Sequence, residues 1–254
     1  QHEQTVCTIT LGECMKAQNL PSSYLPIWFF FKLPILILFG FIYFVYKEKS
    51  IFSSTKNILT IAPLLISSFS IIFLLILFNV NLYDEVRQVM FLIPLFFIIS
   101  MSALFTLPNK LSFVLLCFFI IFFFYQNIKI YPYNYVWLNN LTNLIGINNK
   151  FELDYWGVSS KKIASFINQE SPDENICIIS VRDNGIKDFV ENKKACFLPF
   201  SKLHQKNKRP FYVALTERSI KKGIPNNCKN IYNEKININF SRENLIMAKV
   251  FKCD

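Results

Sequence analysis

The sequence predicts a membrane-embedded all-α bundle of about four transmembrane helices, followed by a small α/β extracytoplasmic domain. Apolar residues make up 52% of the 254 residues and charged residues only 17%, against roughly 25% charged in soluble domains. The apolar residues are also clustered into long runs in the first half of the chain, as in membrane proteins. Beyond residue 130 polar residues return, and strand-like and helix-like patterns alternate.

Each apolar run is close to the length of about 20 residues that a helix needs to cross a bilayer. The four candidate spans are residues 27–46, 58–80, 89–107 and 111–128. Buried helices of a soluble protein are the alternative, but no soluble core requires four such runs in succession. The joint "TLPNKL" between the last two spans is so short that we expect those spans to be adjacent and antiparallel.

Lysine and arginine in the short loops predict the orientation of the bundle. Lysines gather in the loops at 47–57 and 108–110, which we therefore place in the cytoplasm. The loop at 81–88 has one arginine against two acids and is placed outside. By alternation, the bundle at 27–130 lies between an extracytoplasmic loop at 1–26 and an extracytoplasmic domain at 131–254.

The net charge of +10 is carried largely by this translocated tail, so it does not indicate a nucleic-acid partner. Cysteine usage agrees with the topology, because Cys117 lies in a span and the other six cysteines lie on the predicted outer side. An even number in an oxidising compartment permits disulfides. These six are Cys7, Cys14, Cys177, Cys196, Cys228 and Cys253. No pair has zinc-ligand spacing, and neither a metal site nor a cofactor is expected.

The tail contains recognisable local patterns. Residues 130–150 are aromatic and rich in asparagine, which predicts an interfacial or surface loop. Ser159 or Ser160 is a candidate N-cap of a helix that has Ile163, Phe166 and Ile167 on one face. Four segments have strand character, namely residues 176–181, 194–200, 209–218 and 243–252.

Ionisable groups at the edge of the apolar runs are the main candidates for a site, because charges near a bilayer are costly. Arg87 stands at the outer end of the third span, where a guanidinium suits bidentate capture of phosphate. Lys32, at a similar depth on the first span, would add a second cation. Asp84 and Glu85 would pair with Arg87 or bind a sugar hydroxyl or a divalent ion. The alternative is a set of ordinary interfacial charges that end two helices, and spacing alone does not decide between the two.

Four segments occur in one order that together resemble a known family. They are "LPSSYLPIWFFFKLP", "YDEVRQVMFLIP", "YPYNYVWLNN" and "FELDYWGVSSKKI". Across about residues 20–170 the chain is similar to the C-terminal part of bacterial polytopic glycosyltransferases of the GT-C class. These belong to the family-39-like group that is related to the dolichyl-phosphate-mannose protein mannosyltransferases. No single segment is decisive, but all four in this order and topology are fairly specific.

The resemblance implies a polyprenyl-phosphate sugar as donor, the lipid bilayer as environment, and transfer on the outer face of a bacterial inner membrane. Arg87 matches the motif arginine that would hold the donor phosphate, and Lys32 matches a lysine that would assist. Tyr83 matches the motif tyrosine, whereas Glu85 replaces the pattern's glycine and Gln88 its histidine. The remaining matches are Pro132, Tyr133, Tyr135, Asn139, Glu152, Asp154, Tyr155, Trp156 and Gly157.

Among these matches, Asp154 and Trp156 are assigned either to the acceptor side or to locking their loop onto the bundle. The acceptor itself, whether a glycan, a lipid or a protein, is not specified by the sequence. In this class the catalytic carboxylate lies in the first outer loop, and no counterpart is found here. The chain starts at Gln1 without a signal peptide, so we expect it to be the C-terminal part of a longer protein and to be inactive alone.

Two other functions were weighed against this one. A non-enzymatic membrane anchor that displays the outer α/β domain as a binding module remains the main alternative. A transporter would have polar or broken spans near the midplane. The third and fourth predicted spans are almost uniformly apolar, which argues against transport.

Overall fold

The computed structural model describes residues 7–172, 174–181, 183–203, 211–220, 223–238 and 244–253. It divides into two compact units. The first runs to Phe151 and includes Ile238, and the second holds the other described residues from Glu152 onward. Residues 131–151, which the sequence assigned to the outer domain, therefore pack with the helical unit.

The first unit opens with a β-hairpin that the sequence did not predict. Strands β1 (Cys7–Thr10) and β2 (Glu13–Lys16) are antiparallel, and a disulfide joins Cys7 to Cys14. The two turn residues, Leu11 and Gly12, have φ of 53° and 92°. Two successive positive φ values are typical of a type I′ turn, whose twist suits a tight hairpin and favours glycine at the second position.

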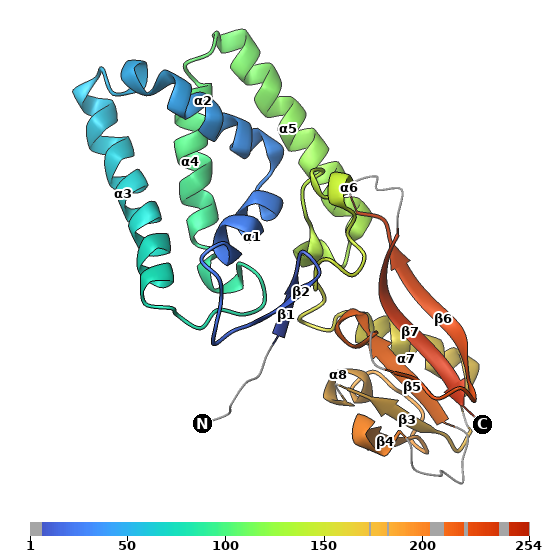
Figure 1. Ribbon diagram of the computed structural model, residues 1–254. Coiled ribbons are helices and arrows are strands. Elements are labelled where there is room, and N and C mark those ends of the chain that lie inside the picture. The colour runs from blue at the N-terminus through green and yellow to red at the C-terminus, as the bar shows by residue number, and fades with distance from the viewer. Residues whose placement is uncertain are drawn as a thin grey trace. The chain divides into compact units, whose positions relative to one another are not determined.

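The first predicted span is broken into two helices. Helix α1 (Tyr24–Lys32) and helix α2 (Ile35–Ile51) meet at an angle of 114° (Figure 1). The break follows from Pro34, since a residue before proline is driven out of the helical region and proline itself has no N–H to donate. Leu33 accordingly has an extended ψ of 136°, and α2 starts directly after Pro34.

Two helices in the described part of the chain are long and apolar enough to cross a bilayer. They are α3 (Thr55–Leu77) and α5 (Asn109–Ile130), and the bent α1–α2 pair would make a third candidate. Helix α4 (Leu92–Leu104) has 13 residues, or about 20 Å at 1.5 Å per residue, against a hydrocarbon core of about 30 Å. The prediction of four full spans is therefore corrected to two or three, because a 3₁₀ turn at η1 (Arg87–Val89) delays the start of α4.

Helix α4 packs against α2 and α3 in the middle of the first unit (Figure 1). Gly40 of α2 lies directly against Ser100 of α4. The Ser100 hydroxyl donates a hydrogen bond to the Ile37 carbonyl oxygen at 2.6 Å. Helix α5 instead diverges from α4, so the expected close antiparallel pair of these two helices is not formed (Figure 1). The divergence leaves the inner side of α5 facing the beginning of α2.

The segment after α5 is folded into the helical unit instead of lying on its surface. It contains η2 (Asn134–Val136) and the short helix α6 (Thr142–Ile145). Its apolar side chains are enclosed, with Tyr133, Val136, Leu138 and Ile147 all 2% exposed or less. The segment predicted as an interfacial or surface loop is therefore part of the core. Trp137 packs on Phe123 of α5, and Phe151 packs on Trp28 and Phe31 of α1.

The second unit is a five-stranded mixed sheet in the order β4-β3-β5-β7-β6. Strand β3 is parallel to β4 and β5, and β7 is antiparallel to β5 and β6. The strands are β3 (Cys177–Ser180), β4 (Cys196–Pro199), β5 (Phe211–Thr216), β6 (Cys228–Ile236) and β7 (Leu245–Cys253). Four of them fall in segments predicted as strands, and β6 was missed because its polar residues do not alternate cleanly.

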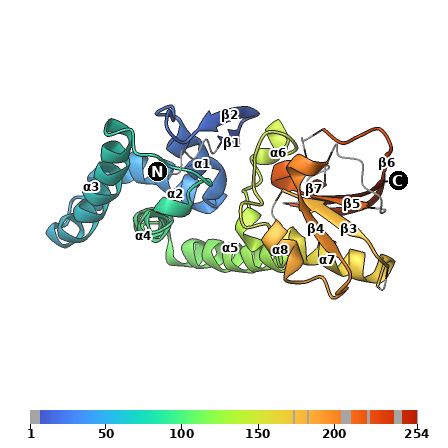
Figure 2. The same cartoon turned by 90° about the horizontal axis from the view of Figure 1, so that it is seen from below.

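One face of this sheet is covered by α7 (Ser159–Glu170) and by α8 (Asp183–Lys187) (Figures 1 and 2). The predicted helix is confirmed, and its Ile163 and Ile167 are completely buried against the strands. The predicted serine cap is wrong, because the helix already includes Ser159 and Val158 occupies the N-cap position. The opposite face packs against two short 3₁₀ turns, η3 (Phe200–Lys202) and η4 (Glu217–Ser219), and their neighbours.

Two disulfides join strands of the second unit. Cys177 pairs with Cys196 and Cys228 with Cys253, each linking residues that lie opposite in neighbouring strands. All six cysteines predicted on the outer side are thus paired, and among the described residues only Cys117 is free. Disulfides form and persist in oxidising compartments, which suggests an extracytoplasmic location for this unit.

Candidate functional site

The loop between α3 and α4 meets the last turn of α1 through a buried ion pair. The Lys32 Nζ lies 2.5 Å from a carboxylate oxygen of Glu85 and donates a hydrogen bond to the Tyr135 carbonyl oxygen at 2.8 Å. The side chains of Lys32 and Glu85 are only 8% and 2% exposed. Because a buried charge is costly unless it is paired, this contact ties three separate segments of the first unit together.

The backbone of this loop is strained where it carries the carboxylates. Asp84 and Glu85 have φ of 57° and 66°, a left-handed conformation that is uncommon outside glycine and persists only where neighbours hold it. The Tyr24 hydroxyl oxygen accepts a hydrogen bond from the Glu85 backbone amide at 3.1 Å. The Thr8 hydroxyl oxygen accepts one from the Asp84 backbone amide at 3.3 Å. Helix α1 and the hairpin therefore fix the loop so that the Glu85 side chain reaches Lys32.

The second ion pair of the loop is more open. The Arg87 Nη1 lies 3.2 Å from the Asp84 Oδ2, and the side chains are 37% and 9% exposed, respectively. Tyr83 and Gln88 close the same loop, since the Tyr83 amide donates to the Gln88 side-chain oxygen at 3.0 Å. Of the two cations that the sequence singled out, Arg87 is accessible to an outside ligand and Lys32 is enclosed.

Two aromatic side chains of α1 are buried next to this loop and the hairpin. They are Tyr24 and Trp28, which are 1% and 0% exposed. The Trp28 indole N–H donates to the Thr10 hydroxyl at 3.0 Å. Each ring therefore has both apolar packing and a polar partner inside the unit.

Asn139 stabilises the end of the broken helix. Its side-chain amide donates to the carbonyl oxygens of Phe30 and Leu33 at 2.6 and 2.8 Å, and its backbone amide donates to Phe31 at 2.8 Å. The last carbonyls of a helix lack partners within the helix, so Asn139 supplies three hydrogen bonds that the break at Pro34 would otherwise leave unmade. This gives a structural reason for an asparagine at this position.

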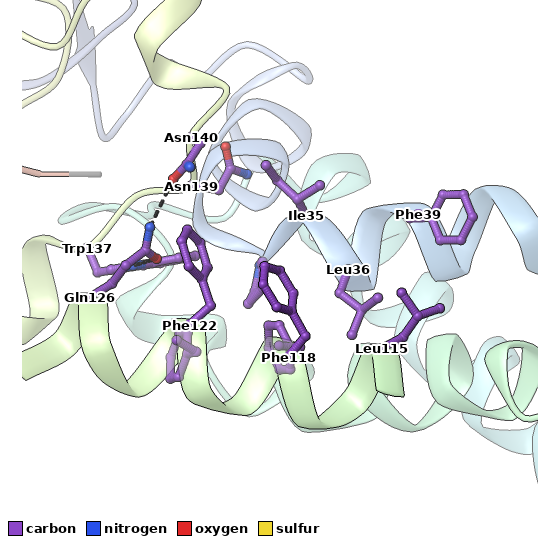
Figure 3. Close-up of a pocket in the computed structure, with 13 residues that line it drawn as sticks. Ile35, Leu36, Phe39, Leu115, Phe118, Phe122, Gln126, Trp137, Asn139 and Asn140 are labelled. Atoms are coloured by element: carbon purple, nitrogen blue, oxygen red, sulfur yellow. Dashed lines mark hydrogen bonds between the residues drawn. The ribbon is translucent and has the colours of Figure 1, made fainter. Parts of the chain in front are cut away.

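An apolar groove runs along α5 beside the start of α2 (Figure 3). Its volume is about 390 Å³, and five of its thirteen lining residues are phenylalanines. Phe118 stacks on Phe122 and Phe119 on Phe123, one helical turn apart. The lining residues are Pro34, Ile35, Leu36, Phe39, Leu115, Phe118, Phe119, Phe122, Phe123, Gln126, Trp137, Asn139 and Asn140.

One end of this groove is polar. The Gln126 amide donates to the Asn140 side-chain oxygen at 3.0 Å, and the Trp137 indole N–H donates to the Gln126 side-chain oxygen at 3.1 Å (Figure 3). Asn139 lies beside them. The lining therefore changes from aromatic to amide along one direction, which is the profile that an amphipathic molecule with an apolar chain requires.

The predicted residues Asp154 and Trp156 belong to the second unit. Asp154 is 1% exposed, and its two carboxylate oxygens accept the Val158 amide at 3.0 Å and the Ser159 hydroxyl at 2.5 Å. These bonds secure the first turn of α7 within the second unit. Trp156 is 57% exposed, and its ring centre lies 5.7 Å from that of Tyr155.

The Glu217 carboxylate, which the sequence did not single out, contacts the same loop at residues 153–154. The side chain of Glu217 in η4 accepts the amides of Leu153 and Asp154 at 3.1 and 3.2 Å. Burial raises the pKa of the Glu217 carboxyl to about 7, and the negative charges of Glu152 and Asp154 act in the same direction. The Arg218 guanidinium forms an ion pair with Glu152.

The groove and the exposed Arg87 side chain could bind and orient a ligand. The described residues hold no group of three His, Cys, Asp or Glu side chains that would bind a metal ion. Sequence reasoning missed Thr8, Thr10 and Gln126, because their roles depend on partners far along the chain. The leucine–glycine turn between two cysteines was the one local signal for the hairpin. Comparison with protein-family models, with curated proteins and with solved structures gave no match.

Proposed function

We propose that the chain is part of an integral membrane glycosyltransferase that moves a sugar from a polyprenyl-phosphate donor to an acceptor on the extracytoplasmic face. In this proposal the first unit binds the donor lipid. The carboxylate that activates the acceptor hydroxyl is not assigned to any residue of this chain. The order of the four sequence motifs suggests the class, and one structural observation carries the assignment of the donor.

That observation is the aromatic groove with its amide end. A cavity of about 390 Å³ suits several units of a branched apolar chain. Stacked phenylalanine faces, such as Phe118 on Phe122, are flat and polarizable, which favours the trigonal carbons of an isoprenoid. Gln126 and Asn140 then mark the point where the apolar chain gives way to a polar group.

The donor phosphate is assigned to Arg87. Glycosyl transfer leaves negative charge on the departing phosphate, and a positioned guanidinium stabilises that charge through paired hydrogen bonds. Asp84 forms an ion pair with Arg87, and more than a third of the Arg87 side chain is still exposed. Lys32 is assigned a supporting role, since its ammonium already lies against Glu85.

The proposal predicts that Arg87→Ala weakens binding of polyprenyl phosphate about ten- to a hundredfold, because a charged hydrogen bond is lost. Binding is measured with the purified chain in phosphatidylcholine nanodiscs that contain increasing amounts of polyprenyl phosphate. Arg87→Lys is expected to recover only part of the affinity, since lysine keeps the charge but not the planar pair of donors.

The matched control is Lys110→Ala, which removes an exposed cation from the predicted cytoplasmic loop. It is expected to bind polyprenyl phosphate as the unchanged protein does. A second control, Phe122→Ala, widens the groove and is expected to weaken binding of the isoprenoid more than binding of a short-chain phosphate. Equal binding by Arg87→Ala and the unchanged protein would exclude Arg87 as the phosphate contact.

A membrane anchor that displays the second unit is the alternative, and a specific feature favours it. Both predicted cations have carboxylate partners within the chain, and the second unit has cores of its own on both faces of its sheet. The anchor predicts no specific affinity for polyprenyl phosphate in any of the variants above. The same titration therefore separates the two functions.

A further inference from the structure

The hairpin of β1 and β2 contacts three other segments of the first unit. The Thr8 hydroxyl oxygen accepts a hydrogen bond from the Asp84 backbone amide at 3.3 Å, which joins the hairpin to the loop between α3 and α4. The Thr10 hydroxyl oxygen accepts one from the Trp28 indole N–H at 3.0 Å. Thr10 also pairs with Phe151 in an antiparallel bridge. The hairpin therefore connects helix α1 with two segments that come much later in the chain.

These contacts depend on the pairing of two short strands. Strands β1 and β2 have four residues each, and a two-stranded hairpin by itself is at best marginally stable in water. The Cys7–Cys14 disulfide joins one strand to the other. Because a cross-link restricts the unpaired conformations of the segment, the disulfide favours the paired strands. It therefore helps to keep the Thr8 and Thr10 hydroxyls in position.

This disulfide is the most accessible of the three in the described part of the chain. Cys14 is exposed, and Cys7 is half-buried. Each of the other two disulfides has one cysteine that is almost completely buried, since Cys177 is 6% and Cys253 is 0% exposed, and their partners are half-buried. Thiol–disulfide exchange begins when a thiolate attacks an accessible sulfur. An external thiol should therefore reduce the hairpin first.

The hairpin is coupled to Arg87 through Asp84. Thr8 contacts the Asp84 amide, while the Asp84 carboxylate and carbonyl oxygen accept hydrogen bonds from the Arg87 side chain at 3.2 Å and the Arg87 amide at 3.3 Å. Asp84 and Glu85 have left-handed backbones, which persist only where neighbours hold them. Both residues have contacts in addition to these, so release of the hairpin should loosen the loop without unfolding it.

We propose that the Cys7–Cys14 disulfide is a redox switch that controls how firmly the loop at 81–88 is held. A thiolate of an external dithiol attacks the Cys14 Sγ, so the disulfide breaks and Cys7 leaves as a thiolate that takes up a proton. The second thiolate of the dithiol attacks the mixed disulfide and releases Cys14, which is protonated in turn. Two electrons thus pass from the dithiol to the hairpin, and the dithiol becomes a disulfide. Reoxidation by a disulfide reverses both steps.

Graded reduction tests the order of these events. The protein in phosphatidylcholine nanodiscs is incubated with increasing ratios of reduced to oxidised dithiothreitol, and free thiols are alkylated and identified by peptide mass spectrometry. Hydrogen exchange of peptides from the loop at 81–88 is measured on the same samples. We expect Cys7 and Cys14 to be reduced before the cysteines of the second unit. The loop should then exchange about tenfold faster or more, and reoxidation should restore slow exchange.

Three variants separate the hairpin disulfide from general effects of the reductant. Cys7→Ser/Cys14→Ser should show fast exchange of the loop without any reductant. The matched control is Cys177→Ser/Cys196→Ser, which removes a disulfide of the second unit, and its loop should exchange as in the unchanged protein. Thr8→Val keeps the disulfide and the shape of the side chain but loses the hydroxyl. It should speed exchange of the loop while the hairpin stays oxidised.

Unchanged exchange of the loop after reduction would overturn the proposal, and so would reduction of the hairpin only together with the buried disulfides. Faster exchange throughout α2 and α4 would overturn it as well, because the disulfide would then support the whole helical unit instead of one loop. None of these measurements uses polyprenyl phosphate, so their outcome does not depend on the proposed function.

Discussion

At the scale of single residues, the Glu217 carboxyl shows how burial changes acid–base behaviour. It lies partly buried beside Glu152 and Asp154 in the second unit, and its pKa rises from 4.5 to about 7. Two backbone amides donate to it and favour the ionised form, but loss of hydration outweighs them. The folded state therefore holds this proton more tightly than the unfolded chain does.

This residue predicts a pH dependence of stability with a defined sign. Because the pKa is higher in the folded state, the contribution of Glu217 is fully present below pH about 4.5 and is lost as the pH rises through about 7. The loss amounts to about 3 kcal/mol at 1.36 kcal/mol per pKa unit. Glu217→Gln should flatten the dependence over this window, which is measured by hydrogen exchange of amides in β5 and β7.

Glu191→Gln is the matched control, because Glu191 is exposed and belongs to the same unit. It should leave the pH profile as it is in the unchanged protein. An unaltered profile in Glu217→Gln would show that another group controls stability between pH 4.5 and 7.

At the scale of elements, the contact between α2 and α4 depends on a single glycine. A Cβ atom on Gly40 would lie 1.9 Å from the Ser100 hydroxyl oxygen and 2.9 Å from the Ser100 carbonyl oxygen. Small residues let the backbones of membrane helices approach closely. The short α4 is held in the bundle mainly by this face, since α5 diverges from it.

Gly40→Ala is therefore expected to destabilise the helical unit by about 1–3 kcal/mol, as overpacking does in a filled core. Thermal unfolding in detergent, followed by helical circular dichroism, measures the effect. Ser100→Ala in the same chain removes the nearest clashing atom and should recover part of the loss.

Gly223→Ala is the control, since no atom lies within 4 Å of the position that its Cβ would take. Its melting temperature should equal that of the unchanged protein. If Gly40→Ala also keeps that melting temperature, α2 and α4 are not in close contact in the membrane.

At the scale of the whole molecule, charge in the short loops predicts the side of the membrane on which each loop lies. Helix α3 separates the lysine-rich loop at 47–57 from the loop that carries Arg87. The six paired cysteines all fall in segments that this rule places outside the cytoplasm. This placement of the cysteines uses the alternation of four predicted spans, whereas the described residues form two or three candidate spans. The disulfides themselves are therefore the evidence that suggests an outer location.

A labelling experiment tests this orientation in sealed cells. Ser53 and Asn81 are exposed residues of the two loops, and each is replaced by cysteine in a separate variant. A membrane-impermeant maleimide should label Asn81→Cys from outside and Ser53→Cys only after the membrane is permeabilised. The reverse pattern would place Arg87 in the cytoplasm and would exclude transfer on the outer face.

The sequence alone determined the class of the molecule, because clustered hydrophobicity and the number of cysteines are properties of composition and order. It predicted a helical membrane part, an outer domain whose cysteines permit disulfides, helix α7 and four of the five strands of the sheet. It also selected Lys32, Glu85, Asp84 and Arg87, since charges beside apolar runs are conspicuous. These features need no knowledge of which segments meet.

Only the tertiary structure decided how those residues are paired. Proximity in sequence suggested that Glu85 would serve Arg87, but the fold brings Glu85 to Lys32 and leaves Arg87 with Asp84. Helix α1 is bent away from α2 at Pro34, and its Tyr24 and Lys32 contact the loop at Glu85. Ion pairs, caps and grooves form between segments that are distant along the chain. A pattern of neighbouring residues does not indicate which distant segment will pack against them.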